Sequence, residues 1–529
     1  MLKFTPVILT NSLTKIARFP QWSGGTGLFV LAFVIRLVYA AQFSFPPLDD
    51  PAYYIQTARS FFTPHPWQVS IIWNFQPRFA TLLHPALDYW QPLPALVIAL
   101  SFWLFGQNLL AAQLPSILAG ALLPVFTFGL GRQVFAKLTN VSSDTAGWLG
   151  LAAGFYLAIN PLLVYQSAAP DSSMLYAALV AGALLGWERE RSRWQAVSLG
   201  LLIGLAYLTR TPAIFFILTG AMWLVWQRNW RDSLWVGLGV ALPIGLWSLR
   251  NWLTFGFVVS PAGLQTIFIF NYQSLFNYQN LPNFSSFGAG GLVQIVKVRW
   301  EALANAWFDV LNSLFFPTVG PALWGLFLLL RQTRVGIGLG ALYSLGLFVG
   351  LPLIFGVAST NGSYYHSVGS SAPVLAIGLI YSGWWLAAWV KRHGWLQVSL
   401  LPALALLLII LTLLKFGASY QAAYAVQQNE GETYRQIGVW LSQHPATSVI
   451  TNEPSSLNYA TGVPTVRLPA AENLDILAQV AAFYHANYII VTENTGLYPY
   501  LLQNAAQNKH FQLVFRAPND AFEIYSVLL

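Results

Sequence analysis

The sequence predicts a polytopic α-helical membrane protein with a small α/β domain outside the membrane at its C-terminal end. Of the 529 residues, 56% are apolar and only 8% are charged, whereas soluble domains are about 25% charged. Long apolar runs alternate with basic clusters, unlike the alternating strands of about ten residues that build an outer-membrane barrel. The chain has no Cys, which excludes disulfides, thiolate catalysis and Cys-ligated metals.

The apolar stretches predict about eleven transmembrane helices, because each is long enough to cross or nearly cross about 30 Å of hydrocarbon. Neighbouring stretches are joined by short polar segments, many of them basic. The stretches are 27–43, 109–130, 146–165, 173–187, 195–209, 212–227, 233–253, 317–330, 335–356, 371–390 and 396–416.

One further apolar stretch, residues 92–105, decides the topology. With about fourteen residues it is short for a membrane span. If it lies on the surface, the N-terminal Lys3, Lys15 and Arg18 fall on the same side as the later basic clusters, as the positive-inside rule requires. If it crosses, every later cluster moves outside. We therefore predict an interfacial helix, an uncleaved first span with a cytoplasmic N-terminus, and an extracytoplasmic C-terminus.

This topology divides the chain into two parts. Residues 1–419 form a transmembrane module with exterior loops at 44–108 and 254–316, and residues 420–529 form an extracytoplasmic α/β domain. Ten of the 18 carboxylates lie in the first part and eight in the final 110 residues, where apolar runs shorten to strand length. The predicted strands are 449–451, 465–468, 488–492, 511–515 and 522–527, and the predicted helices are 432–443, 473–486 and 496–508.

Exterior carboxylates of the membrane module are the first candidates for chemistry, because charge is costly near a bilayer. Asp49 and Asp50 open a helix just after the first span, and Asp171 opens another helix on the same face. Helix capping explains these positions as well as a catalytic role does. An adjacent like charge can raise one carboxyl pKa towards that of a general base. The other exterior acids are Asp88, Glu301 and Asp309.

Basic and histidine side chains on the exterior side are candidates for binding an anion. Arg210 and Arg250 lie at outer helix ends, where guanidinium groups can grip phosphate, although snorkelling to lipid headgroups is an equal alternative. His366 follows a Gly-Ser-Tyr-Tyr run. The sequence leaves open whether Asp49 and His65 bind a divalent cation, although no tight ligand spacing supports such a site. Nucleotide-binding and common hydrolase motifs are absent from the sequence.

With these residues in view, the chain resembles the GT-C class of membrane glycosyltransferases, in its protein O-mannosyltransferase and lipid A aminoarabinose transferase branch. Asp49-Asp50 with Tyr53 is similar to the Asp-Glu-x-x-Tyr motif of the first exterior loop. Asp171 matches the second acidic position. The other matching runs are Trp90-Gln91-Pro92-Leu93, Phe105-Gly106, Ala111-Ala112-Gln113-Leu114-Pro115-Ser116, and Arg250-Asn251 with Phe255-Gly256. Trp90 or Gln91 replaces a family Lys, and Gln113 replaces a family Arg.

The resemblance implies an inverting transfer of a sugar from a polyprenyl-phosphate donor to a protein, lipid or glycan acceptor, on the outer face of the plasma (inner) membrane. Asp49 would be the base, with Asp50 and Asp171 as orienting acids. The remaining roles are phosphate binding by Arg210, Arg250 and His366, and a substrate cavity with Tyr53, His84, Trp90 and Tyr365.

Two other functions remain open from the sequence. One is a transporter or flippase for a lipid-linked or small polar solute, although Arg36 is almost the only ionisable residue within the spans,. The other is a non-catalytic scaffold that presents the α/β domain. Nucleic acid is not expected as a partner, because the net charge of +8 comes from basic residues at helix ends, as the positive-inside rule predicts.

Overall fold

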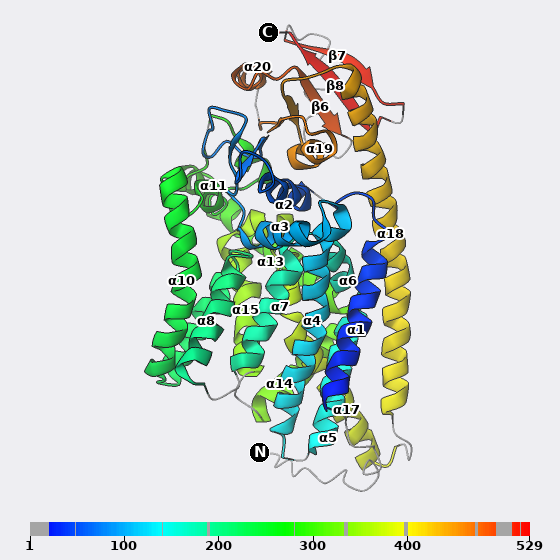
Figure 1. Cartoon of the computed structure of the whole chain (residues 1–529). Helices are drawn as coiled ribbons and strands as arrows, with labels where there is room; N and C mark the ends of the chain where they lie inside the picture. Colours follow the sequence, from blue (N-terminus) through cyan, green and yellow to red (C-terminus); the bar gives the residue numbers. More distant parts are fainter. Residues whose placement is uncertain are drawn as a thin grey trace.

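The structure is a computed structural model that describes residues 21–47, 49–139, 141–187, 191–279, 281–332, 337–395, 400–470, 474–492, 510–518 and 520–528. A bundle of long helices forms its main part, two helices lie across one end of the bundle, and a sheet lies beyond them (Figure 1). The predicted helix 496–508 and the basic residues before residue 21 lie outside the described residues.

Each apolar stretch predicted to span the membrane overlaps a helix of the bundle, except that 146–165 is divided between two helices, α5 and α6, at a 55° bend. Six helices are long and apolar enough to cross a membrane, or up to eight if each of two bent pairs counts as one span, among the residues that are described. The chain is therefore a multi-pass membrane protein. The bundle helices are α1 (Gln21–Ala40), α4 (Leu109–Ala136), α5 (Ser143–Ala158), α6 (Pro161–Ala168), α7 (Ser172–Trp187), α8 (Arg193–Tyr207), α9 (Ala213–Trp226), α10 (Trp230–Phe255), α13 (Gly291–Leu314), α14 (Phe316–Gln332), α15 (Ile337–Ile354), α17 (Ala372–Arg392) and α18 (Leu401–Gln443).

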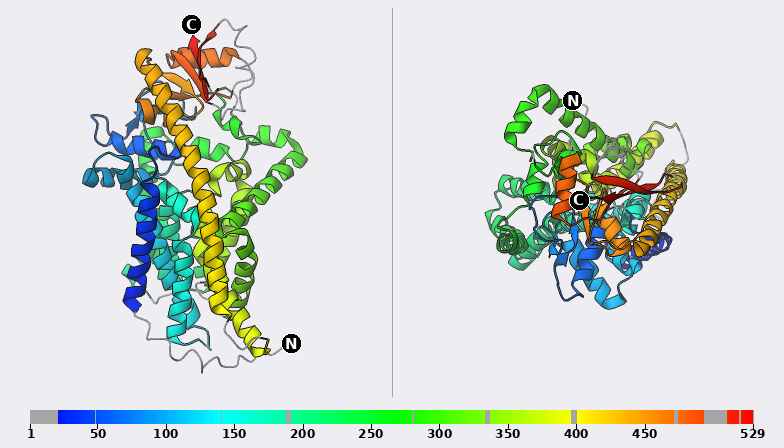
Figure 2. Two further views of the ribbon diagram at one scale, coloured as in Figure 1. Left: turned by 90° about the vertical axis from the view of Figure 1, so that its right-hand side faces the viewer. Right: turned by 90° about the horizontal axis from the view of Figure 1, so that it is seen from above.

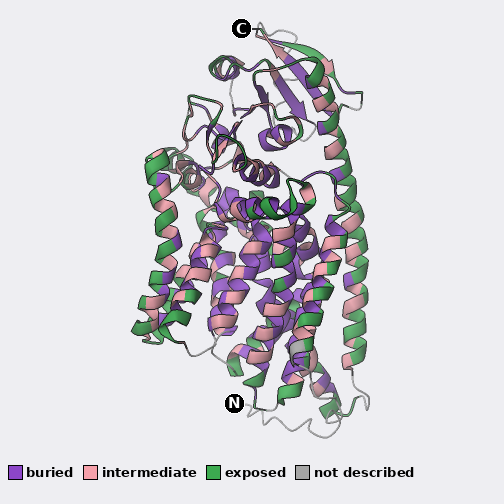
Figure 3. Ribbon diagram, viewed as in Figure 1, coloured by how far each residue is buried: buried purple, intermediate pink, exposed green. Residues whose placement is uncertain are grey.

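Burial in the bundle follows the position of each helix. The central helices are mostly buried, while α10 and α18 expose much of their surface at the sides of the bundle (Figure 3). Exposed leucines recur along both peripheral helices, for example Leu242 at 56% and Leu414 at 67%. Apolar side chains exposed in this way suit hydrocarbon rather than water.

The helices α2 (Asp49–Ser60) and α3 (Leu93–Phe105) lie across the end of the bundle rather than along it (Figure 1). In α3, Leu104 and Phe105 are exposed, while Ala95 and Ile98 are buried against the loop that precedes the helix. This crosswise arrangement is the one expected of an interfacial helix.

The break between α5 and α6 is stabilised by Arg36, a fully buried residue of α1. Its guanidinium donates to the carbonyl oxygens of Ala158 at 2.9 Å and Leu157 at 3.3 Å, and to Ser167 Oγ at 3.0 Å. The 55° bend leaves these carbonyls without helical partners, so a donor from a neighbouring helix satisfies them.

Within the expected exterior loop 254–316, the structure has short helical segments and the 24-residue helix α13. The short segments are α11 (Pro261–Gln265), η1 (Tyr272–Phe276) and α12 (Phe284–Ala289). Val298, Ala302, Ala306 and Val310 recur at helical spacing in α13 and are buried. The polar composition before residue 291 concealed this amphipathic pattern.

Beyond the crosswise helices lies a six-stranded sheet with the order β2-β5-β4-β6-β8-β7. The first four strands are parallel, and β8 pairs antiparallel with both β6 and β7. The strands are β2 (Ile71–Ile72), β4 (Val449–Thr451), β5 (Thr465–Arg467), β6 (Tyr488–Thr492), β7 (Phe511–Arg516) and β8 (Phe522–Val527).

The five strands predicted after residue 448 are confirmed. The sixth strand, β2, comes from the first exterior loop, so this loop and the C-terminal region share one sheet. A second, two-stranded sheet in the same loop pairs β1 (Gln68–Val69) with β3 (His84–Pro85). Figure 2 shows how α18 runs along the bundle and continues up to the sheet, with no interruption at residue 420.

Candidate active site

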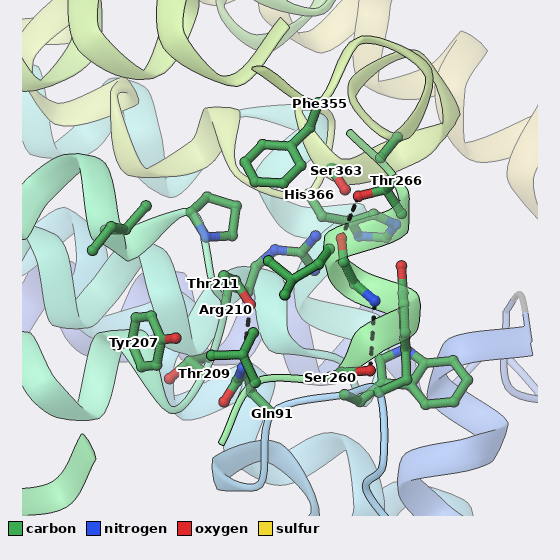
Figure 4. Close-up of a pocket in the computed structure, with 18 of the residues that line it drawn as sticks. Gln91, Tyr207, Thr209, Arg210, Thr211, Ser260, Thr266, Phe355, Ser363 and His366 are labelled. Atoms are coloured by element: carbon green, nitrogen blue, oxygen red, sulfur yellow. Dashed lines mark hydrogen bonds between the residues drawn. The ribbon is translucent and has the colours of Figure 1, made fainter. Parts of the chain in front are cut away.

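A cavity of about 220 Å³ opens where α2, α3 and the loops between the bundle helices meet. Charged and polar side chains from distant parts of the chain converge on it (Figure 4). Its acidic, guanidinium and imidazole lining residues are Asp50, Asp88, Arg210 and His366. The tyrosine and tryptophan side chains that line it are Tyr54, Trp73, Tyr89, Trp90, Tyr207, Trp247 and Tyr272.

The carboxylate of Asp171 is the best-satisfied acid beside this cavity. Its Oδ2 lies 2.8 Å from His366 Nδ1 and accepts from Ser173 Oγ at 2.8 Å, while its Oδ1 accepts from Ser172 Oγ at 2.9 Å. Arg210 Nη1 donates to the same Ser172 hydroxyl at 2.6 Å. The structure thus brings three predicted site residues, Asp171, Arg210 and His366, into one network.

The motif run around Gln113 helps to position Asp171. Gln113 Nε2 donates to the carbonyl of Ala168 at 2.8 Å, and Ser116 Oγ donates to the backbone carbonyl of Asp171 at 3.2 Å. Both polar side chains come from α4 and are buried. Gln113, which replaces the Arg of the family motif, therefore holds the backbone that precedes the acid.

His366 is placed by an irregular segment between α15 and α17. This segment consists of α16 (Gly356–Ala358), η2 (Ser359–Ser363) and η3 (Val368–Ser370). Gly362 has a φ of 107°, which side chains other than glycine rarely adopt,. A Cβ at this position would also lie 3.4 Å from the His366 ring. The turn at Gly362 therefore directs the imidazole towards Asp171.

Asp49 and Asp50 have different surroundings although they are adjacent. Asp50 lines the cavity together with Tyr54. Asp49 instead accepts hydrogen bonds from Ser455 Oγ and the Ser456 N–H, both at 2.9 Å, at the start of α19 (Pro454–Thr461). The side chain of Asp49 therefore caps a helix of the C-terminal region and does not line the cavity,.

The carboxyl pKa values distinguish Asp171 from Asp49 and Asp50. Burial raises the pKa of Asp50 to about 6, and the nearby Asp171 charge adds to this rise while His366 opposes it. Burial also raises the pKa of Asp49. Burial acts on Asp171 in the same direction, but the charge and hydrogen bond of His366 outweigh it and hold the Asp171 pKa well below its usual range. The low pKa of Asp171 favours its ionised form, while Asp50, with a pKa of about 6, can exchange a proton near neutral pH,.

Arg210 and Arg250, predicted together as phosphate ligands, have different surroundings. Arg210 lines the cavity. Arg250 is absent from the lining: its Nη2 donates to the Ala86 carbonyl at 2.7 Å, and its guanidinium lies 4.8 Å from the ring centroids of Trp247 and Phe255. Arg250 therefore ties α10 to the first exterior loop.

Of the four predicted cavity residues, only Trp90 lines the cavity. Tyr53 is fully buried behind it, stacks on Trp90 with ring centroids 4.0 Å apart, and accepts from the Leu87 N–H at 2.8 Å. His84 is buried against Phe79 at 3.9 Å, and burial lowers its pKa to about 3. The backbone carbonyl of Tyr365 accepts from Gln166 at 2.9 Å.

The suggested cation ligands, Asp49 and His65, have different surroundings: Asp49 caps α19, while His65 is exposed on a loop. In the part of the chain that the structure describes, no group of three or more His, Asp or Glu side chains could hold a metal ion.

Further lining residues were given no site role from the sequence. Asp88, one of the exterior acids singled out there, lines the cavity, and burial raises its pKa to about 6. Gln91 lines the cavity and donates to Thr211 Oγ1 at 3.2 Å (Figure 4). Tyr54 follows Asp50 at the spacing with which Tyr53 follows Asp49, so a register shifted by one residue could have indicated it.

The family and the sequence relatives that this chain matches are all named as sugar transferases. A family described as dolichyl-phosphate-mannose-protein mannosyltransferase matches residues 84–249. An undecaprenyl phosphate-alpha-4-amino-4-deoxy-L-arabinose arabinosyl transferase of Pseudomonas aeruginosa (strain UCBPP-PA14) is 28% identical over 163 residues, covering 29% of this chain and 27% of the relative. A similarly named enzyme of Pseudomonas fluorescens (strain Pf0-1) is 24% identical over 244 residues, 42% of this chain and 39% of the relative.

Two solved structures share the fold over nearly the whole chain. ArnT from Cupriavidus metallidurans bound to undecaprenyl phosphate has a TM-score of 0.58 at 14% identity, covering 95% of this chain and 98% of its own. The Archaeoglobus fulgidus oligosaccharyltransferase in complex with Zn and sulfate has a TM-score of 0.55 at 14% identity, covering 96% and 73%. The resemblance to the GT-C class of membrane glycosyltransferases is therefore confirmed.

Proposed function

We propose that this chain, whose fold is that of the GT-C class, is an inverting glycosyltransferase that uses a polyprenyl-phosphate-linked sugar as donor. The single observation that carries the proposal is the cavity in which Asp50 and Arg210 face the same space beside the Asp171–His366 pair. The sequence relatives, which are named as undecaprenyl phosphate arabinosyl transferases, and the undecaprenyl phosphate bound to ArnT from Cupriavidus metallidurans support the same donor chemistry. The comparisons lend no support to a transporter.

Asp50 is the general base of the proposed reaction, in place of Asp49. The oxygen of an acceptor hydroxyl bonds to the anomeric carbon of the sugar while the bond from that carbon to the phosphate oxygen breaks. The hydroxyl proton moves to the Asp50 carboxylate, and the electron pair leaves with polyprenyl phosphate. A single displacement of this kind inverts the anomeric centre. A carboxylate with a pKa near 6 suits a base at neutral pH.

Arg210 and His366 stabilise the charge that develops on the leaving phosphate. Arg210 presents a guanidinium to the cavity, and guanidinium groups form strong charge-assisted hydrogen bonds to phosphate oxygens. His366 is fixed by Asp171 at 2.8 Å, so that a protonated imidazole would add a second positive charge. Asp171 is an orienting acid here, because its oxygens are already occupied by Ser172, Ser173 and His366.

The placement of the protein in the cell belongs to the same proposal. Residues 1–419 form the transmembrane module, with about eleven spans and exterior loops 44–108 and 254–316, and residues 420–529 form the extracytoplasmic domain. The N-terminus is cytoplasmic and the site lies on the outer face of the plasma membrane. Basic residues lie at the start of α8, at the start of α10 and at the end of α14. These helix ends are at the end of the bundle away from the cavity (Figure 1), which supports this orientation.

The test supplies purified protein with a panel of undecaprenyl-phosphate sugars and a membrane extract as the source of acceptor. Release of undecaprenyl phosphate is measured, with Asp50→Asn as the inactive reference. The proposal predicts that one sugar of the panel is consumed by the unmodified protein and not by the variant. Equal consumption by both proteins, or movement of a solute across proteoliposomes without consumption of donor, would overturn it.

A further inference from the structure

A second pocket lies at the end of the bundle opposite the candidate active site, where α8 and α10 begin side by side (Figure 1). Its volume is about 330 Å³. Each helix contributes one arginine and one tryptophan: Arg193 and Trp194 come from α8, and Arg231 and Trp235 come from α10. The other lining residues are Ser192 and Val197.

Close backbone packing brings the two helix N-termini together. α8 and α10 pack at Gly200 and Gly239, where an added Cβ would lie 2.1 Å from the Val236 carbonyl oxygen or 2.2 Å from that of Val197. Only glycine permits this approach. Because both helices run in the same direction from this end (Figure 1), their positive dipole ends are adjacent.

The arginines of the pocket keep their charge available. The nearby carboxylate of Asp232 is already engaged by Arg191, whose Nη2 and Nε lie 2.8 Å and 3.1 Å from Asp232 Oδ2. None of the ion pairs within the described part of the chain includes Arg193 or Arg231. The Arg193 guanidinium lies 5.9 Å from the Trp235 ring centroid. Two guanidinium groups and two helix N-termini therefore create a local excess of positive potential.

The surface next to the pocket is apolar and faces away from the bundle. Trp194 is 81% exposed and Trp230 is 64% exposed, as is typical of tryptophans at the membrane interface. Leucines at every fourth position then continue along α10 away from the pocket. They are Leu234, Leu238, Leu242 and Leu246, each at least half exposed.

From this arrangement we propose that the pocket binds the phosphate headgroup of an anionic diacyl phospholipid of the membrane leaflet opposite the candidate active site. Arg193 and Arg231 grip the phosphate, and the acyl chains lie along the exposed leucines of α10. Basic pockets between transmembrane helices are known to suit such headgroups. A free phosphate would satisfy the arginines equally well, but it would leave the tryptophans and leucines without a role.

The experiment is native mass spectrometry of the purified protein titrated with phosphatidylglycerol, and in parallel with phosphatidylcholine. The unmodified protein is expected to bind phosphatidylglycerol preferentially. Each basic residue near an anionic lipid contributes about fivefold to binding, so Arg193→Gln together with Arg231→Gln should weaken phosphatidylglycerol binding by about 25-fold. The charge-preserving pair Arg193→Lys and Arg231→Lys should retain most of the binding, which separates charge from a loss of folding.

Arg331→Gln is the matched control, because Arg331 lies at the end of α14 outside the pocket. This variant should bind phosphatidylglycerol as the unmodified protein does. The inference is overturned if the double glutamine variant keeps its affinity, if the two lipids bind equally, or if millimolar inorganic phosphate displaces phosphatidylglycerol. None of these outcomes bears on the proposed transfer reaction, because the pocket lies at the other end of the bundle.

Discussion

Asp49 and Asp50 are consecutive residues, yet Asp50 lines the cavity while Asp49 caps α19 in the C-terminal region. This division links the proposed chemistry to the fold. α2 is held from one side by the C-terminal region through Asp49, and also through Gln56, whose Nε2 donates to Asn458 Oδ1 at 2.6 Å. α2 also presents Asp50 to the cavity. The C-terminal region therefore helps to fix the position of the proposed base.

The pH dependence of transfer should follow the titration of Asp50. Its pKa is raised to about 6, and only the deprotonated carboxylate can accept the hydroxyl proton. kcat/KM should therefore fall as the pH drops through about 6. Since the Asp49 charge contributes to this rise, Asp49→Asn should move the acidic limb of the pH–rate profile to lower pH. An acidic limb that does not move would contradict the assignment.

Arg210 and Arg250 should respond differently to substitution. Arg210→Gln removes a charged donor from the cavity and should lower kcat/KM for the donor about 10- to 100-fold, with little change in Tm. Arg250→Gln should chiefly lower Tm, because the Ala86 carbonyl loses its donor at 2.7 Å. Steady-state kinetics and thermal unfolding in the same detergent check both. Similar effects of the two variants on kcat/KM would show that the distinction is wrong.

Arg36→Met should destabilise the membrane bundle. The substitution removes the guanidinium donors of the Ala158 and Leu157 carbonyls, and the Leu157 carbonyl keeps the Asn160 N–H at 3.4 Å, so we expect a cost of about 3 kcal/mol. A clear drop in the thermal unfolding midpoint is expected. Val38→Met on the same helix, where the side chain is 58% exposed, is the control and should leave Tm unchanged. An unaltered Tm in the Arg36 variant would argue against the stabilising role.

Glu453, at the start of α19, should make stability depend on pH. Burial raises its pKa to about 8, and the Asp49 charge adds to this rise. A raised pKa means that the folded protein binds the proton more tightly than the unfolded chain. The stabilisation is complete below the usual pKa of 4.5 and is lost as the pH rises through about 8. The Tm of Glu453→Gln, compared with the Tm of the unmodified protein at the same pH, should therefore rise as the pH increases from 5 to 8. A constant difference would contradict this.

Much of the fold could be predicted because its determinants are local. Apolar runs of membrane-spanning length marked the bundle helices, and β6 (Tyr488–Thr492) and β8 (Phe522–Val527) have the predicted bounds. Two features were not predicted. The pairing of Ile71–Ile72 with β5 involves only two residues of the loop, and α13 was concealed by the polar loop before it.

The candidate site was predicted less completely, because side-chain direction is set by tertiary contacts. The sequence indicated that Asp171, Arg210 and His366 belong to the site, since charge is rare near the bilayer. It could not show which carboxylate of the adjacent pair faces the cavity, because this depends on the hydrogen bonds that Ser455 and Ser456 donate to Asp49.

The most direct test of the proposed function compares Asp50→Asn with Asp49→Asn in the rate of undecaprenyl phosphate release from the accepted donor. Loss of the general base should lower the rate about 1,000-fold in Asp50→Asn, whereas Asp49→Asn should stay within about fivefold, because an amide oxygen can still accept a hydrogen bond from α19. Both variants must retain the Tm of the unmodified protein within a few degrees. An inactive, folded Asp49→Asn beside an active Asp50→Asn would contradict the account.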